Sequence, residues 1–192
     1  MKEEPALGMI EYKSVAQGIR SADAIVKMAP VTIFRSHTIS PGKYINLFAG
    51  EVADVEESFR AGVEASNDGV INKVFIPFLH RDLVPALQGK LKKPPLDSLA
   101  ILESLSVCSC VEAVDKALKA APVKLVELQL GQGLGGKGYF ILTGDLTDLE
   151  ASLEVAQTYL SEDGTLAGVE IIPAPHTEMI DSTISENRGA IL

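Results

Sequence analysis

The chain has 192 residues, of which 46% are hydrophobic and 5% aromatic, and its 17 Lys and Arg stand against 26 Asp and Glu, a net charge of −9. Nucleic-acid-binding proteins usually carry a basic patch or stripe, and no basic cluster here is larger than residues 90–93. No stretch reaches the roughly 18 apolar residues of a membrane span, and the acidic start lacks the pattern of a signal peptide. We therefore expect a cytoplasmic protein that contacts neither nucleic acid nor membrane.

Six elements are predicted along the first half of the chain. Apolar spacing of helical period predicts a helix from Ser14 to Ala29, with Ser14 as N-cap and Pro30 behind its end, and a second helix that begins near Glu51. Together with the four strands given next, these helices produce the order strand, helix, strand, strand, helix, strand, which is typical of a ferredoxin-like unit. Alternating or continuous apolar runs mark the four strands at residues 6–12, 31–39, 43–49 and 70–78.

The second half of the chain repeats the first. Residues 22–31 match residues 114–123 at a displacement of 92, and His80 falls on His176 at a displacement of 96. Such self-similarity indicates a duplicated unit, and the growing displacement places small insertions in the loops of the second copy. The predicted fold class is α+β, with two tandem ferredoxin-like domains. We expect a first domain at 1–90, a linker at 91–97, a second domain at 98–180 and a polar tail at 181–192.

A glycine-rich segment in the second copy is the most prominent local motif. Residues 131–138 contain Gly133, Gly135 and Gly136 and match both a G-x-G-x-x-G pattern and a G-x-x-x-x-G-K pattern. A phosphate-binding loop must lead into the N-terminus of a helix, but the following residues 139–143 are apolar and strand-like. The segment is therefore interpreted as a turn between two strands or as a functional loop of another kind, and nucleotide binding is not favoured.

The remaining polar residues do not indicate an enzyme. His80 and His176 are interpreted as caps of a short terminal helix in each copy, and Cys108 and Cys110 lie two residues apart on a predicted helix, where they cannot share a metal ion. No arrangement of Ser, His and Asp or of Cys and His recurs between the copies, so no catalytic residue and no metal site is predicted.

One charged pair recurs in both copies. Asp23 and Lys27 are four residues apart on the first helix, as Asp115 and Lys119 are on its repeat. Such a pair stabilises an isolated helix by only about 0.3–0.5 kcal/mol. Its recurrence indicates either a local helix pair or a surface that both copies present in the same way.

Five runs of the sequence are informative together, at residues 7–11, 22–31, 42–44, 50–55 and 172–176. In this order they resemble a known family, the bacterial microcompartment shell domain. With two copies in unpermuted order, the chain is similar to the tandem-domain, trimer-forming shell proteins, and especially to the propanediol-utilisation type, whose pore loop binds an iron–sulfur cluster. The resemblance implies a pseudo-hexameric trimer that tiles into a sheet with a central pore.

The resemblance also implies roles for single residues. Lys27 and Lys119 match the lysine of the tile-edge contacts, and the pore loop corresponds to residues 38–43. Ser40 replaces the cysteine of the cluster-binding members, so no iron–sulfur cluster and no other cofactor is expected. Phe78 and Ala174 stand where many shell proteins have an edge arginine. The pore would be lined by Ile39, Ser40, Pro41 and Gly42.

These observations predict a structural shell protein with a central polar pore for small metabolites or ions. The expected partners are two further copies in a homotrimer, other shell proteins and encapsulated enzymes, and the expected location is the microcompartment shell in the cytoplasm. Two alternatives stay open at this point. One is an electron-transfer shell protein with an iron–sulfur cluster at the pore, and the other is a small-molecule-binding sensor of ferredoxin-like fold that uses the glycine-rich loop.

Overall fold

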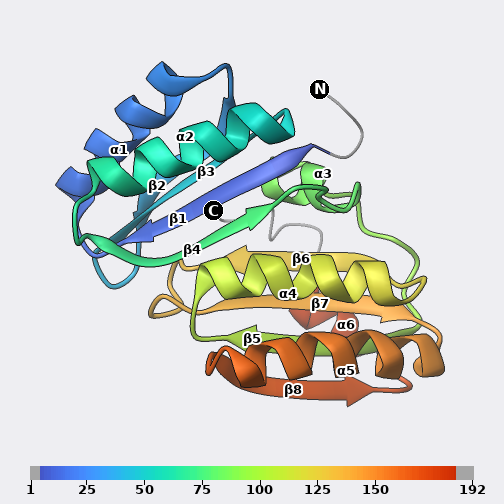
Figure 1. The fold of residues 1–192 in the computed structure, drawn as a ribbon. Coiled ribbons are helices and arrows are strands. Elements are labelled where there is room, and N and C mark those ends of the chain that lie inside the picture. The colour runs from blue at the N-terminus through green and yellow to red at the C-terminus, as the bar shows by residue number, and fades with distance from the viewer. Residues whose placement is uncertain (1–4, 185–192) are drawn as a thin grey trace.

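The computed structural model describes residues 5–184 and contains two similar α+β domains side by side (Figure 1). The predicted order of elements is found in both domains, each followed by a short extra helix. The elements of the first domain are β1 (Ala6–Tyr12), α1 (Val15–Met28), β2 (Thr32–Ile39), β3 (Lys43–Gly50), α2 (Val52–Ala65), β4 (Val70–Ile76) and α3 (Leu83–Leu87). Those of the second are β5 (Ser98–Ser104), α4 (Val107–Ala120), β6 (Lys124–Leu130), β7 (Gly138–Gly144), α5 (Leu146–Glu162), β8 (Leu166–Ile172) and α6 (Thr177–Thr183).

Each domain has one antiparallel four-stranded sheet. The strand order is β2-β3-β1-β4 in the first and β6-β7-β5-β8 in the second. Two helices cover one face of each sheet, α1 and α2 in the first domain and α4 and α5 in the second (Figure 1). The opposite face of the first sheet packs against α3 and α4. The opposite face of the second sheet is covered in part by the linker and α6.

Helix α1 begins and ends as the sequence predicts. The Ser14 hydroxyl accepts a hydrogen bond from the backbone N–H of Gln17, and Ser106 accepts one from Ser109 at the start of α4. Both caps satisfy a backbone donor that the first turn of a helix leaves without a partner. The second helix of each domain also begins in the same way. An acidic residue that follows a glycine is the N-cap, Glu51 for α2 and Asp145 for α5.

Alternation along β1 divides its side chains between two separate cores. Ile10 and Tyr12 pack under α1 and α2 in the core of the first domain. Leu7 and Met9 point to the other face of the sheet and join a larger core that continues into the second domain, where it includes Val111 of α4. The two domains therefore share a continuous hydrophobic core and are held as one body.

The regions between and after the domains are short. Residues 90–97, which include the predicted linker at 91–97, contain no helix or strand. The predicted polar tail at 181–192 starts inside α6, and residues 185–192 lie outside the described part of the chain. Among the described residues, none of the helices has the length and apolar character needed to cross a membrane.

Candidate functional site: the paired loops and the domain seam

The predicted pore loop and the glycine-rich loop lie against each other. Residues 40–42 join β2 to β3, and residues 131–137 join β6 to β7. The backbone N–H of Gly133 points to the Ser40 hydroxyl oxygen at 3.4 Å. A Cβ atom on Gly136 would lie 2.9 Å from the carbonyl oxygen of Ser40, and one on Gly131 would lie 2.8 Å from the Cβ of Ile39. Only glycine permits this approach, so the sequence of the second loop fits its contact with the first.

A polar cavity of about 430 Å³ opens between these two loops. Its polar groups are the Ser40 and Thr38 hydroxyls, the Gln132 amide and backbone groups, and it has no charged lining residue. Gly131, Gly133, Gly135 and Gly136 all have positive φ, and the segment leads into strand β7. Without a helix after it, this loop lacks the feature by which a phosphate loop binds its ligand.

The cysteines of the chain do not supply the ligands of an iron–sulfur cluster at this loop. Cys108 and Cys110 are free and fully buried in α4, and burial raises the pKa of both thiols. Iron–sulfur clusters are held by thiolates, whereas Ser40 offers a hydroxyl. Within residues 5–184 there is also no group of three or more His, Cys, Asp or Glu side chains arranged to hold a metal ion. The residues present therefore do not fit a cluster at the pore loop.

The second candidate region is the domain seam, which we define as the contact of α4 with β1, β4 and the residues that follow β4. Asp115 lies at its centre with 3% of its surface exposed. The backbone N–H of His80 donates to one carboxylate oxygen of Asp115 at 2.7 Å, and Lys119 donates to the other. Lys119 also donates to the carbonyl oxygen of Phe78. The structure thus places Lys119 across the contact between the two domains of one chain.

A second polar cluster lies at the other end of the seam. The Asn72 amide donates to the Ser106 and Ser109 hydroxyls at 2.8 and 2.9 Å. The Glu11 carboxylate is fully buried there, where it pairs with the Lys43 ammonium at 2.7 Å. Together with Asp115, these contacts fix how α4 sits on the first sheet.

The surface of α1 that is equivalent to the seam surface of α4 is exposed. Ile19 and Val26 of α1 are 54% and 48% exposed, whereas their repeat equivalents in α4, Val111 and Leu118, are 0% and 4% exposed. The Asp23 side chain is 62% exposed and pairs with Lys27. The structure therefore brings Lys119, but not Lys27, into contact with another domain.

Of the two repeat-equivalent histidines, His176 caps its helix as predicted, whereas His80 lies before Asp82, the N-cap of α3. His176 is the N-cap of α6, and its Nδ1 accepts the backbone N–H of Glu178 at 3.3 Å. His80 Nδ1 accepts the backbone N–H of Asp82 at the same distance, just before α3.

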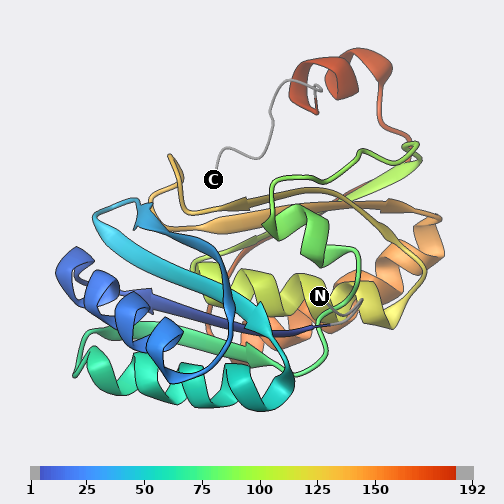
Figure 2. The same ribbon diagram turned by 90° about the horizontal axis from the view of Figure 1, so that it is seen from above.

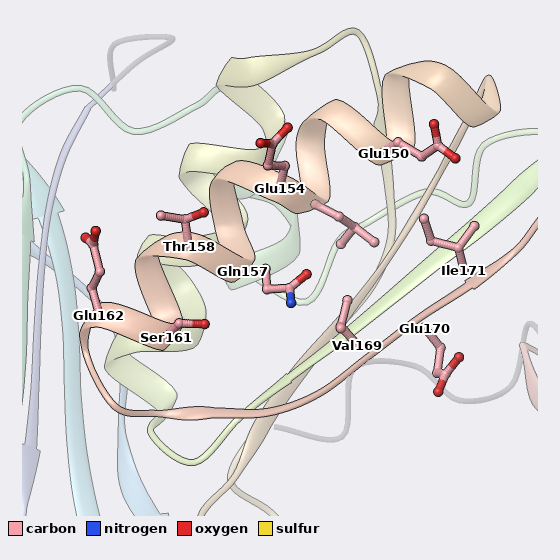
Figure 3. Close-up of a pocket in the computed structure, with 10 residues that line it drawn as sticks. Glu150, Glu154, Gln157, Thr158, Ser161, Glu162, Val169, Glu170 and Ile171 are labelled. Atoms are coloured by element: carbon pink, nitrogen blue, oxygen red, sulfur yellow. The ribbon is translucent and has the colours of Figure 1, made fainter.

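The second domain also has an acidic groove between α5 and β8 (Figure 3). Glu150, Glu154 and Glu162 stand along the helix, and the apolar Val169 and Ile171 form the opposite wall. In the first domain the equivalent space holds Phe59 and Phe75, whose rings lie 6.0 Å apart. The smaller side chains of the second copy leave the groove open. No motif in the sequence indicates this groove.

The comparisons with known proteins decide the family. A family model described as the BMC domain matches residues 6–79 and again residues 98–175. The chain belongs to the BMC domain family. The predicted resemblance to tandem-domain microcompartment shell proteins and the predicted α+β fold with two tandem domains are both confirmed.

Individual relatives agree with this result. The bacterial microcompartment shell protein PduT of Citrobacter freundii is 33% identical over 174 residues, which cover 91% of this chain and 95% of PduT. A crystal structure of a microcompartment protein from Desulfitobacterium hafniense DCB matches with a TM-score of 0.85 and 35% identity over 91% of this chain and 97% of that one. The fused permuted hexameric shell protein MSM0275 shares the fold, with a TM-score of 0.58 and 20% identity over 82% of both chains.

Matches of this extent show that the chain has a structural role in a shell. Its location is the microcompartment shell within the cytoplasm. The electron-transfer and sensor alternatives are not favoured by these relatives.

Proposed function

We propose that three copies of this chain assemble head to tail into a pseudo-hexameric shell tile with a polar pore on its axis. The observation that carries the proposal is the contrast between the two repeats. Inside the chain, α4 covers the face of the first sheet that lies opposite α1 and α2. The same helix of the first repeat, α1, leaves Ile19 and Val26 exposed. On the equivalent face of the second sheet, which α6 covers only in part, Ile101 and Glu103 are half-buried.

The two unused surfaces complement each other by repeat symmetry. Glu11 of β1 is fully buried by the seam, but its equivalent in β5, Glu103, is 46% exposed and pairs with Lys137 at 3.4 Å. A neighbouring α1 would cover Glu103 as α4 covers Glu11. Such a heterologous contact forms either a closed ring or an open filament. The shell proteins that this chain resembles form a ring of six domains. Three chains with two domains each would close such a ring.

The pore is proposed from the paired loops. In the trimer, three copies of residues 39–42 would alternate with three copies of residues 131–137 around the axis. Their lining of hydroxyl, amide and backbone groups favours small polar metabolites or ions, and the donor chemistry of Ser40 does not favour an iron–sulfur cluster. We propose no resident cofactor and no catalytic activity.

Other shell proteins and encapsulated enzymes remain the proposed partners, since the relatives are shell and carboxysome assembly proteins. We also propose that Lys27 and Lys119 contribute to the edges between tiles, as the resemblance implies. Although Lys119 makes contacts in the seam, its side chain is 42% exposed. The exposed part is free to contact a neighbouring tile.

Light scattering on the purified chain tests the assembly. At micromolar concentration the mass should be three times that of one chain, and Ile19→Lys should reduce it because a charge would replace an apolar side chain of the unused α1 surface. Ile71→Lys is the matched control, since Ile71 is 44% exposed on β4 and its side chain lies outside the repeat-related contact. A monodisperse monomer in the unchanged protein would overturn the proposal.

A further inference from the structure

A cationic pocket lies where the linker passes over the junction of the two domains. We name it the linker pocket and define it by Arg81, Asp82, Pro85, residues 90–92, Pro94, Lys124 and Leu125, which line an open cavity of about 520 Å³. Figure 2 shows its supporting elements, with α3 beside β6 and the linker above them. Cavities of this size are typical of small-molecule sites.

The charge of this pocket opposes that of the whole chain. Four cationic side chains, Arg81, Lys90, Lys92 and Lys124, surround it, with Asp82 as the single carboxylate, in a protein of net charge −9. Among residues 5–184, Arg81 has an ion pair, a long one of 3.8 Å to Asp82, and the three lysines have none. Like charges held together raise the local potential, and an anion in the cavity would neutralise it.

The floor of the pocket is apolar and firmly held. Leu125 is 3% exposed and Leu91 packs against the core shared by the two domains. The backbone N–H of Lys90 donates to the carbonyl oxygen of Pro85 at 2.7 Å, and Lys93 is anchored by a contact of its ammonium group with the carbonyl oxygen of Ile184. A ligand would therefore meet a preformed surface, which lowers the entropy lost on binding.

The repeat shows that this pocket is not a general feature of the fold. Arg81 is equivalent to Thr177 in the second copy, and Lys124 is equivalent to Thr32 in the first. The cations are thus confined to the contact that is made inside one chain. Since fold formation does not require them, their gathering at one cavity indicates a ligand.

From this geometry we propose that the linker pocket binds an organic anion with two or more phosphate groups and an apolar or aromatic part, the chemistry of a nucleoside diphosphate. The lysines and Arg81 bind the phosphates as point charges and hydrogen-bond donors. The apolar part lies on Leu91, Leu125 and the prolines. This site is separate from the glycine-rich loop and is complete in one chain, so it does not depend on trimer formation.

Isothermal titration calorimetry tests the site, with ADP, inorganic pyrophosphate and adenosine as probes in EDTA at low salt. ADP should bind, pyrophosphate should bind at least tenfold more weakly, and adenosine should show no binding. The exposed pair Lys92 and Lys124 is changed to alanine, which should weaken ADP binding by at least tenfold. Lys73→Ala, at an exposed lysine of β4, is the control for general charge effects and should leave the affinity unchanged.

Three results would overturn the proposal. The absence of binding heat with ADP at millimolar concentration would show that the site does not exist. If Lys73→Ala weakened ADP binding as much as the double variant, the attraction would come from general charge and not from this pocket. Equal affinities for ADP and pyrophosphate would remove the role of the apolar floor. Circular dichroism and light scattering of each variant verify that folding and assembly are unchanged, so that a loss of binding refers to the pocket.

Discussion

The backbone N–H of His80 donates to the Asp115 carboxylate at 2.7 Å across the seam between the two domains. The same carboxylate accepts from Lys119, which in turn reaches the carbonyl oxygen of Phe78. A single buried acid thus satisfies a backbone donor and a cation from two domains. By repeat symmetry, the corresponding pair is Asp23 and His176, in which the Asp23 side chain is 62% exposed.

Replacement of Asp115 should destabilise the folded chain. Asp115→Ala leaves the N–H of His80 without its acceptor and Lys119 without its counter-charge, and the loss of such partners in a buried site costs about 1–3 kcal/mol. Urea unfolding followed by circular dichroism measures the change in the free energy of unfolding. An unchanged unfolding midpoint would contradict the structural role assigned to this carboxylate.

The matched change at Asp23 should act on assembly instead. In an isolated chain, Asp23→Ala removes only an exposed helix pair with Lys27, which contributes about 0.3–0.5 kcal/mol. In the proposed trimer, the N–H of His176 in a neighbouring chain loses its acceptor. We expect nearly unchanged secondary structure but a trimer that dissociates at higher protein concentration than the unchanged trimer. Sedimentation velocity over a dilution series measures this shift, and equal dissociation of both proteins would argue against the repeat-related contact.

Lys27 provides a test of the proposed tile edge. Lys27→Asp places a second carboxylate beside Asp23. Because repeat symmetry puts Lys27 in the proposed contact between chains, as Lys119 lies in the seam, we expect the variant to weaken the trimer and to lose the sheets of tiles. Electron microscopy detects the sheets and light scattering the trimer. Lys27 is changed rather than Lys119, because Lys119→Asp would bring a carboxylate next to buried Asp115 and destabilise the single chain. Sheets of normal extent from the variant would leave Lys27 with a helix-surface role alone.

The sequence predicted the elements well because their signals are local. Ser14, Pro30 and the apolar spacing of α1 determine that helix without reference to the rest of the chain. The seam could not be predicted in the same way, since α1 and α4 have the same apolar pattern and only packing makes Val111 buried and Ile19 exposed. The contact of the glycine-rich loop with Ser40 was missed for a similar reason, because it joins residues about a repeat apart. The run at residues 90–93 was noted for its charge, but its position over a cavity depends on α3 and β6.

The buried thiols predict a pH dependence of stability. Burial raises the pKa of Cys108 and Cys110 in the folded chain, whereas an unfolded thiol ionises near pH 8.5. Above that pH the unfolded state binds fewer protons than the folded state, so stability is fully present below it and falls as pH rises. The expected loss is about 1.4 kcal/mol per pH unit for each thiol, or about 2 kcal/mol per thiol between pH 8.5 and 10.

Urea unfolding at pH 7, 8.5 and 10 measures this loss. The double variant Cys108→Ala with Cys110→Ala is less stable at every pH because it leaves small cavities, but its stability should change much less between pH 8.5 and 10. If the variant and the unchanged protein lose stability in parallel over that range, other groups dominate the alkaline response.

Ser40 sets the ligand chemistry of the proposed pore. Three copies of Ser40 around a threefold axis would present hydroxyls, and these bind the iron of a cluster far more weakly than thiolates do. Anaerobically purified protein should therefore lack the broad visible absorption of an iron–sulfur cluster and should not gain it on treatment with iron and sulfide. Ser40→Cys should gain it, with iron and sulfide in proportion to trimers. Ser182→Cys, at an exposed position of α6, controls for adventitious binding by a new thiol and should stay colourless. Stoichiometric iron and sulfide in the unchanged protein would replace the proposed polar passage with an electron-transfer site.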